Sequence, residues 1–361
     1  MGETQTSFRW YSRADIAACH GVLDGARLHE VACRAWADIA SGTAYGLKST
    51  ISVSASELPE HKGLKRPAEL PERLGWKLSC LSSVNRTYGS VKIVGANALN
   101  RTAGLPRSSS TILLLDKLTM TPLCAMDATD VSAARTASYA TVVMERFFKG
   151  RSRISIFLFG AGPVAERIIL ALQACAASAI DRLTVRSRTR SSAEDLAARL
   201  RPQVSFELSA ASEGGKALSD ADFVITATNA KAPVFEAADV EHGLILHLGG
   251  DETPPAHLEQ VLRKGLVVCD SIEMVSRRSS QSLALYFKQH GTMLETAGPL
   301  LGVRNLATAS GGDVPTGTPV HITCVGLPML DLYVGAHVYE TLLMNDRINP
   351  SPAAGISPCM S

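Results

Sequence analysis

The spacing of hydrophobic residues changes near residue 154, and the predicted elements of the chain are arranged around this point. Residues 154–159 are almost continuously apolar, the run breaks at Gly160, and apolar residues then return at helical spacing from Val164 to Leu172. A short apolar run followed by a period of 3.6 residues predicts a strand, a tight turn and a helix. A second apolar segment at 183–189 predicts the next strand, so this region is the first half of a βαβ unit.

The small residues at the turn have separate physical uses. Gly160 permits the tight turn, Gly162 lets backbone N–H groups approach a pyrophosphate, and Ala165 lets the helix pack close to the strand. The helix opens at Pro163 and Val164, and its unpaired N–H groups and dipole favour a bound phosphate. The pattern predicts dinucleotide binding, and the alternative is a plain turn between strand and helix.

The residues after the second strand bear on the choice of cofactor. An NAD site has a carboxylate there for the ribose 2′-hydroxyl, whereas an arginine accommodates a 2′-phosphate. The chain reads Ser187-Arg188-Thr189 at this point, with no carboxylate before Glu194. NADP(H) is therefore favoured and NAD(H) is possible. The alternative is a solvated basic loop before a capping box at Ser191 and Glu194.

The remaining pattern predicts an open β layer, a long helix and a set of alternating strands and helices. Helices are expected to open at Ser12 and Asp24, and another is expected over 128–148 with Arg135 inside it. Residues 53–75 are polar and proline-rich and are expected to form an excursion from the core. Strands are expected over 76–81, 90–96, 110–116, 204–208, 222–228, 244–249 and 266–269. Residues 320–326 and an amphipathic helix over 330–344 are expected to return to the first domain.

These elements predict an α/β fold of two domains. Residues 136–317 are expected to form a Rossmann domain with a doubly wound parallel sheet, in which ligands bind beyond the carboxyl ends of the strands. Residues 1–135 and 318–361 are expected to form an α+β substrate-binding and dimerisation domain. The 361-residue length suits two cores of this size.

Composition excludes several other classes of protein. The net charge is +2 and only 19% of residues are charged, which argues against a nucleic-acid partner. No apolar run is long enough to span a membrane. The eight cysteines form no CxxC pair, which suits a reducing cytoplasm, and the nine histidines show no HxxH or HExxH spacing, so no metal site is expected.

Five motifs, in order, resemble the ornithine cyclodeaminase/mu-crystallin family. They are Lys92-Ile-Val-Gly-Ala-Asn97, Gly104-Leu-Pro-Arg107-Ser-Ser, Asp127 followed by Ser132-Ala-Ala-Arg135-Thr-Ala, Gly160-Ala-Gly162 and Gly249-Gly250-Asp251. The resemblance runs from about Ser7 to Glu340. It implies a homodimer whose substrate lies between a Rossmann domain and the domain built from both ends of the chain.

The resemblance also implies roles for individual residues. Lys92 and Arg135 would hold the substrate carboxylate, and Asp251 would exchange a proton with the reacting nitrogen. Each residue also has a purely structural alternative. Asp251 could lie in a turn or cap a helix, Lys92 could extend its ammonium to solvent along an apolar strand, Arg135 could form a structural ion pair, and Cys324 could pack in the core. The candidate cofactor contacts are Gly160, Gly162, Pro163, Val164, Ser187, Arg188, Thr189, Thr226, Thr228, Arg107, Arg135 and Cys324.

Three departures from the ornithine-cyclising members bear on function. The strand before the lysine motif carries Lys77 in place of an acid, Thr253-Pro254-Pro255 follows Gly-Gly-Asp where those members have a lysine, and the NAD-selecting aspartate is missing. Lys77 suits a substrate with an extra carboxylate. The Gly104–Arg107 stretch resembles the branch that acts on amino-acid conjugates, such as aminocarboxyethyl-glutamate dehydrogenase.

The leading hypothesis is an NAD(P)(H)-dependent oxidoreductase that acts on a C–N bond of a small amino or imino acid. It would be an imine or ketimine reductase, or an opine-like amino-acid dehydrogenase. The alternatives are ornithine cyclodeaminase, a lyase that returns its hydride and forms proline and ammonia, and a non-catalytic binding protein like some mu-crystallin relatives.

Overall fold

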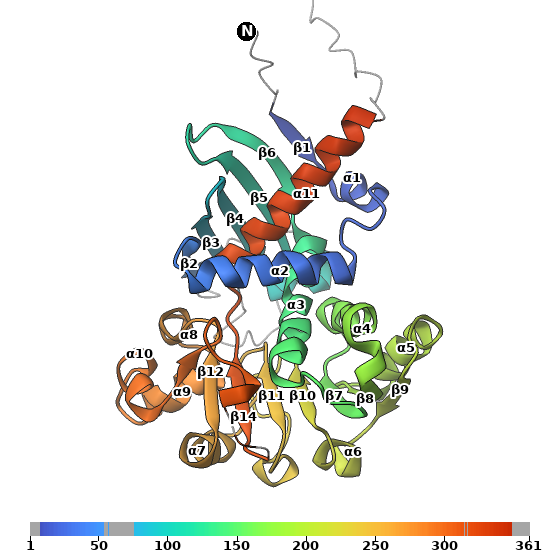
Figure 1. Cartoon of the computed structure of the whole chain (residues 1–361), viewed down its shortest axis with the longest axis vertical. Coiled ribbons are helices and arrows are strands. Elements are labelled where there is room, and N and C mark those ends of the chain that lie inside the picture. The colour runs from blue at the N-terminus through green and yellow to red at the C-terminus, as the bar shows by residue number, and fades with distance from the viewer. Residues whose placement is uncertain (1–7, 54–56, 58–75, 314, 316, 349–361) are drawn as a thin grey trace, which may run out of the picture.

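The strands of the protein gather into two separate sheets (Figure 1). The computed structural model describes residues 8–53, 57, 76–313, 315 and 317–348 of the 361-residue chain. The expected excursion at 53–75 lies almost entirely outside the described residues.

The first sheet has six strands in the order β1-β6-β5-β4-β3-β2, antiparallel except for the β1–β6 pair. Its strands are β1 (Arg9–Tyr11), β2 (Tyr45–Ser52), β3 (Lys77–Val84), β4 (Tyr88–Ala96), β5 (Ser108–Asp116) and β6 (Pro122–Asp127). Side chains alternate between its faces, so Ile112 and Leu114 are buried beside Leu332 and Val338 of the last helix, α11 (Pro328–Ile348). The expected strands correspond to β3, β4 and β5, whereas β1, β2 and β6 were not expected.

The second sheet has eight parallel strands in the order β13-β12-β14-β11-β10-β7-β8-β9. Its strands are β7 (Ile154–Phe159), β8 (Ile180–Arg186), β9 (Glu207–Ala211), β10 (Phe223–Thr226), β11 (Leu244–His247), β12 (Leu266–Cys269), β13 (Arg304–Asn305) and β14 (Val320–Thr323). Both faces are covered: Ile156 and Leu158 of β7 join one core cluster, and Phe157 and Phe159 join another. The predicted doubly wound parallel sheet is confirmed.

Two expectations about this sheet are wrong. The strand expected over 204–208 lies at Glu207–Ala211, because the preceding helix runs on into a 3₁₀ turn at Arg201–Gln203. Residues 320–323 were expected to return to the first domain, but β14 pairs with β11 and β12 inside the second sheet. The return to the first sheet therefore begins after β14, with α11.

The helices join the two sheets. Ser12 and Asp24 cap the first two helices, as expected. The long helix α3 (Thr129–Phe147) packs against α2, α4 and α11, so it contacts elements of both halves (Figure 1). The other helices are α1 (Arg13–Ala18), α2 (Gly25–Ala40), α4 (Pro163–Ala176), α5 (Arg190–Leu200), α6 (Gly215–Ser219), α7 (Pro255–Lys264), α8 (Ile272–Arg278), α9 (Ser282–Gln289) and α10 (Leu294–Ala297). Among the described residues, none of the helices is both long and apolar enough to span a bilayer.

Candidate active site

The glycine turn after β7 lies where the strand order of the second sheet reverses. From β7 the chain continues through β8 and β9 to one edge, and β10 then lies on the other side of β7. Gly160 has a φ of +124°, and a Cβ there would lie 2.5 Å from the carbonyl oxygen of Ala227. A Cβ on Gly162 would meet open space, and Pro163 opens α4. This geometry fits a dinucleotide pyrophosphate at the helix N-terminus.

The segment after β8 leaves one arginine available to a ligand. Arg186 is anchored, because its guanidinium donates to the carbonyl oxygens of Val234 and Ser212. Arg190 pairs with Glu194, whereas Arg188 is exposed and forms no hydrogen bond or ion pair with the described part of the chain. Thr189 is the N-cap of α5, so the capping box considered at Ser191 does not form.

The threonines at the end of β10 have different surroundings. Thr226 is completely buried, whereas Thr228 is partly exposed and donates its backbone N–H and its hydroxyl to the carboxylate of Glu252. Arg107 reaches across from the first half of the chain and donates to the side-chain oxygen of Asn229 at 2.8 Å. Of the two threonines, only Thr228 therefore borders the space around the glycine turn.

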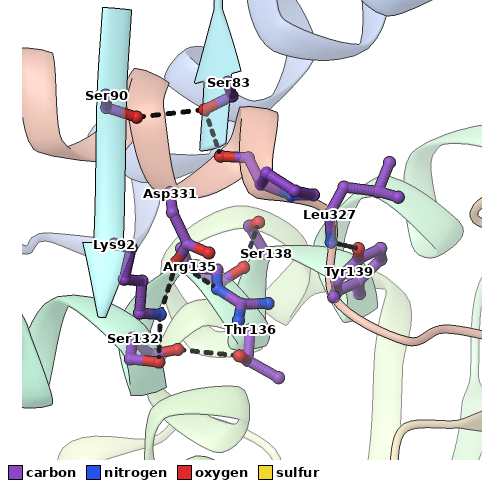
Figure 2. Close-up of polar contacts among 12 residues, drawn as sticks. Ser83, Ser90, Lys92, Ser132, Arg135, Thr136, Ser138, Tyr139, Leu327 and Asp331 are labelled. Carbon is purple, nitrogen blue, oxygen red and sulfur yellow. Dashed lines mark hydrogen bonds and ion pairs between the residues drawn. The ribbon is translucent and has the colours of Figure 1, made fainter. Parts of the chain in front are cut away.

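Lys92 and Arg135 converge on a carboxylate that the sequence analysis did not identify. The Lys92 ammonium donates to Asp331 Oδ1 at 2.7 Å and to the Ser132 hydroxyl at 2.7 Å, and Arg135 Nε donates to the same Oδ1 at 2.7 Å (Figure 2). The side chains of Lys92 and Asp331 are each 1% exposed. The three groups, named here the buried triad, carry two positive charges and one negative charge.

The charges of the buried triad stabilise one another against the cost of burial. Burial opposes ionisation of Asp331, but Arg135 and Lys92 outweigh it and lower the pKa of this carboxyl group. Burial lowers the pKa of Lys92 to about 8, although Asp331 partly compensates. Asp331 Oδ2 has no hydrogen-bond partner among the described residues. The triad therefore keeps a net positive charge and one acceptor atom without a partner.

The connection between β14 and α11 is held beside the buried triad. Asp270 accepts the backbone N–H groups of Val325 and Gly326, each at 2.9 Å. Gly326 has a φ of +84°, and a Cβ there would lie 2.7 Å from Arg135 Nη1, so both the backbone and the close approach favour glycine. Lys48 and Arg278 each donate to the carbonyl oxygen of Val325 at 3.1 Å. The triad and these two cations therefore flank one short segment.

Lys48 and Arg278 also line a cleft of about 610 Å³ between the first sheet and α8. Its other charged lining residues are Lys77, Arg277 and Glu273, and Glu273 pairs with Arg277. Burial, followed by the nearby Arg278, lowers the pKa of Lys48 to about 7. Of the described residues that line the cleft, four are therefore basic and one is acidic.

Asp251 follows Gly249-Gly250 at the end of β11. It is partly exposed, and its carboxylate forms no hydrogen bond or ion pair within the described ranges. Helix α7 begins four residues later with Pro254 as its N-cap, so Asp251 does not cap it. A Cβ on Gly250 would lie 3.8 Å from the carbonyl oxygen of Ser280, which lines the cleft, and Ser282, the first residue of α9, donates its backbone N–H to the Gly250 carbonyl oxygen. The glycine-aspartate turn therefore borders the cleft.

The sequence comparison assigns the family. A sequence model described as "Ornithine cyclodeaminase/mu-crystallin family" matches residues 77–297, more than half of the chain. The chain belongs to this family. A Dictyostelium discoideum protein named "Uncharacterized cyclodeaminase" is 29% identical over 167 residues, which cover 42% of this chain and 44% of that protein. The match therefore spans less than half the length of that relative.

Solved structures share the fold of this family member. Δ1-Pyrroline-2-carboxylate reductase of Thermococcus litoralis, in complex with NADH and L-proline, has a TM-score of 0.75 and 22% identity, covering 93% of this chain and 98% of that chain. The iminosuccinate reductase of Paracoccus denitrificans, in complex with NAD⁺, has a TM-score of 0.71 and 17% identity, covering 93% and 96%. At these identities the likeness shows the fold.

Several residues of the candidate site were not predicted from the sequence. Asp331 is a lone carboxylate inside an apolar run, Leu327-Pro-Met-Leu-Asp331-Leu, and this isolation is the signal that could have revealed it. Lys48 lies on β2, and because this strand has no clear apolar alternation, neither the strand nor the place of Lys48 in it was predicted. Cys324 is 2% exposed and packs in the core. Burial raises its pKa far above the usual range of a thiol, as expected for a packing residue.

Proposed function

We propose that the protein is an NADP(H)-dependent oxidoreductase that acts on the C–N bond of an amino or imino acid with more than one carboxylate. The reaction would be reduction of the imine or its reverse, oxidation of the amine. The observation that carries this proposal is the basic cleft, in which, among the described lining residues, the basic side chains of Lys48, Lys77, Arg277 and Arg278 outnumber the carboxylate of Glu273. The dinucleotide turn after β7 and the glycine-aspartate turn after β11 support it, because both follow carboxyl ends of strands in the parallel sheet, where ligands bind in folds of this class.

The charge of the cleft supports an anionic substrate rather than a distal amine. One carboxylate of the substrate would be attracted by Arg135 and the net positive buried triad, and a second would be attracted by Lys48 and Lys77. A second ammonium, as in ornithine, would meet these cations and be repelled. The name of the Paracoccus relative, an iminosuccinate reductase, refers to an imine with two carboxylates.

The chain supplies the groups that would manage protons and orientation. When bound, the nicotinamide supplies or accepts hydride at the substrate carbon. Asp251 is the proposed proton donor to the reacting nitrogen, because its carboxylate is partly exposed and has no partner among the described residues. Lys92 is already bound to Asp331 and Ser132, so its proposed role is to hold the triad in place and contribute charge.

Arg188 is the proposed selector of the 2′-phosphate. Fluorescence titration of Arg188→Ala should show NADPH affinity reduced by about 10- to 100-fold, the usual cost of losing charge-assisted hydrogen bonds, with NADH affinity unchanged. Arg190→Ala is the matched control, because Arg190 already pairs with Glu194. Equal affinity of the wild type for NADPH and NADH would refute the proposed selectivity.

The substrate class can be tested by following the absorbance of NADPH at a wavelength specific to the reduced cofactor. We expect consumption with imines or oxo-acid and amine pairs that carry two carboxylates, and lower kcat/KM with monocarboxylate imines. Ammonia and proline formed from ornithine without net cofactor change would overturn the proposal in favour of the cyclodeaminase reaction. Asp251→Asn with every measured property unchanged would instead favour a binding protein.

A homodimer is also proposed, through the outer face of the first sheet. Apolar side chains of β2, β3 and β4 share this face and remain exposed: Leu47 is 67%, Ile51 60%, Leu78 41% and Ile93 49% exposed. Trp10 of β1, 54% exposed, lies on the same face at the other edge of the sheet. An apolar patch that extends across a whole sheet is typical of an interface between subunits.

A further inference from the structure

Three side chains with metal-binding atoms meet where α2 packs on α3, outside the proposed active site. His29 and Cys33 are four residues apart on α2 and so lie on one face of that helix, and Glu145 comes from α3. Helices α2 and α3 pack against each other, and Figure 1 shows them crossing. Among the described residues, this is the one group of three or more such side chains whose ligand atoms all lie within 4.8 Å of one another.

We propose that His29, Cys33 and Glu145 form a binding site for a divalent transition metal, with zinc as the best match. The Cys33 Sγ lies 3.6 Å from His29 Nε2 and 3.2 Å from Glu145 Oε2, and the last two atoms are 3.3 Å apart. In a zinc tetrahedron with bonds of about 2.3 Å to sulfur and about 2.1 Å to nitrogen and oxygen, the sulfur edges are about 3.6 Å and the N–O edge is about 3.4 Å. The three ligand atoms are therefore already spaced to surround the ion.

The histidine of this site is oriented by a hydrogen bond behind it. His29 Nδ1 lies 2.9 Å from the Thr141 hydroxyl oxygen, and that hydroxyl donates its own hydrogen to the carbonyl oxygen of Ser138 at 3.1 Å. In the metal-bound form Nδ1 would carry the hydrogen and donate it to the Thr141 hydroxyl oxygen, which leaves the lone pair of Nε2 for the ion. A histidine ligand whose other nitrogen donates to a fixed acceptor is the usual arrangement at protein metal sites.

Charge and access also suit a bound cation. A Cys33 thiolate and the Glu145 carboxylate would together neutralise a divalent ion. The His29 side chain is 21% exposed and that of Glu145 is 56% exposed, so the ion can enter from solvent and keep a water as its fourth ligand. A cysteine thiol must lose its proton to bind a metal, so metal binding at Cys33 would release a proton and tighten as pH rises.

This proposal opposes the expectation of no metal site. That expectation rested on the absence of HxxH and HExxH spacings, whereas the proposed ligands are a His-x-x-x-Cys pair and a glutamate 112 residues from the cysteine. The site would join α2 to α3, the helix that carries Arg135, so its expected effect is to fasten these two helices together.

Titration of the purified full-length protein with Co²⁺ tests the site directly, because a tetrahedral thiolate complex absorbs strongly at wavelengths where the protein does not. We expect one equivalent to give thiolate charge-transfer and d–d bands, and Zn²⁺ to displace them. Cys33→Ser should abolish the thiolate band. Glu145→Gln should weaken Co²⁺ binding at least tenfold, and because Glu145 is half exposed this variant should fold normally.

Cys175→Ser is the matched control, because this exposed thiol lies on neighbouring α4. Its Co²⁺ spectrum should equal that of the wild type, and loss of the bands would overturn the assignment of the three ligands. As a second measurement, Zn²⁺ at 100 times its Kd should raise the Tm by about 3–4 °C in the wild type. An equal rise in Cys33→Ser and Glu145→Gln, or no thiolate band in the wild type, would refute the site.

Discussion

Replacement of Asp331 by asparagine tests whether the buried triad is held by charge. The substitution keeps the size of the side chain but removes the one carboxylate, among the described residues, that accepts from both Lys92 and Arg135, at 2.7 Å each. The amide oxygen can still accept at the Oδ1 position, with the NH2 group in place of the unpartnered Oδ2, so the change removes the charge and leaves the two donors in place. Because the Asp331 side chain is 1% exposed, water cannot replace the lost carboxylate without opening the site.

The expected cost is large enough to measure by thermal unfolding. Removal of one partner from a buried ion pair destabilises a protein by about 3–5 kcal/mol, because it leaves an uncompensated buried charge. The unfolding entropy is about 2.1 cal/mol/K per residue, or about 0.76 kcal/mol/K for the chain, so the Tm of Asp331→Asn should fall by about 4–7 °C. The wild type and the variant are compared by calorimetry at pH 7.

Asp130→Asn provides the control. Asp130 accepts from Arg13 at 2.6 and 3.0 Å, but the Arg13 side chain is 65% exposed, so its loss should cost less than about 1 kcal/mol. The pKa of Asp331 is lowered by folding, so its contribution is present above the ordinary aspartate pKa of about 4 and is lost as pH falls through the lower folded value. Equal Tm losses in the two variants, or a loss for Asp331→Asn that persists unchanged in strong acid, would refute the reasoning.

Three further predictions concern the cleft, the outer sheet face and the turn before Asp251. The pKa of Lys48 is about 7, so its ammonium loses its charge as pH rises above this value, and the KM for an anionic substrate should climb by up to about tenfold per pH unit. Lys48→Arg should abolish this climb, and a KM that is flat from about pH 6 to 9 in the wild type would contradict the assignment. Ile93→Lys should convert the proposed dimer to a monomer in light-scattering measurements, whereas Leu118→Lys, at a position 92% exposed in the turn between β5 and β6, should not. Gly249→Ala places a Cβ 2.1 Å from a buried carboxyl group and should cost about 1–3 kcal/mol in denaturant unfolding, whereas Gly250→Ala, whose nearest atom lies at 3.5 Å, should cost much less.

The sequence predicts those parts of the fold that local rules determine. The strand–turn–helix at Gly160 was predictable because a continuous apolar run, a glycine turn and a helical period follow one another within about twenty residues. The caps at Ser12 and Asp24 were predictable for the same reason, since a cap is satisfied by its own helix. β2 was missed because it lies at the sheet edge with most of its residues exposed, so it lacks a clear apolar alternation.

The placement of β14 could not be deduced from its own residues. An apolar strand of four residues fits either sheet, and its partners are fixed by β11 and β12, which lie more than fifty residues earlier in the chain. The family motifs led to Lys92 and Arg135, and the structure brings these two side chains together. Their shared acceptor, Asp331, was missed because the last helix was predicted from the spacing of its apolar residues. In such a prediction a single aspartate is assigned to the solvent-facing side of the helix.

Asp331 shows why a carboxylate clamp cannot be inferred from its cations alone. Lys92 and Arg135 were expected to meet the carboxylate of a substrate, yet a carboxylate of the chain already lies between them. Two buried cations without a counter-ion would repel each other and resist desolvation, so an internal anion is what makes their burial tolerable before substrate arrives. The remaining positive charge is one unit for the triad plus Lys48 and Arg278, which donate to the adjacent Val325 carbonyl oxygen, and it is what would attract the proposed anionic substrate. This proposed attraction would therefore depend on the number of cations exceeding the single negative charge of Asp331. Asp331 lies 196 residues from Arg135, so the motif around Arg135 could not reveal it.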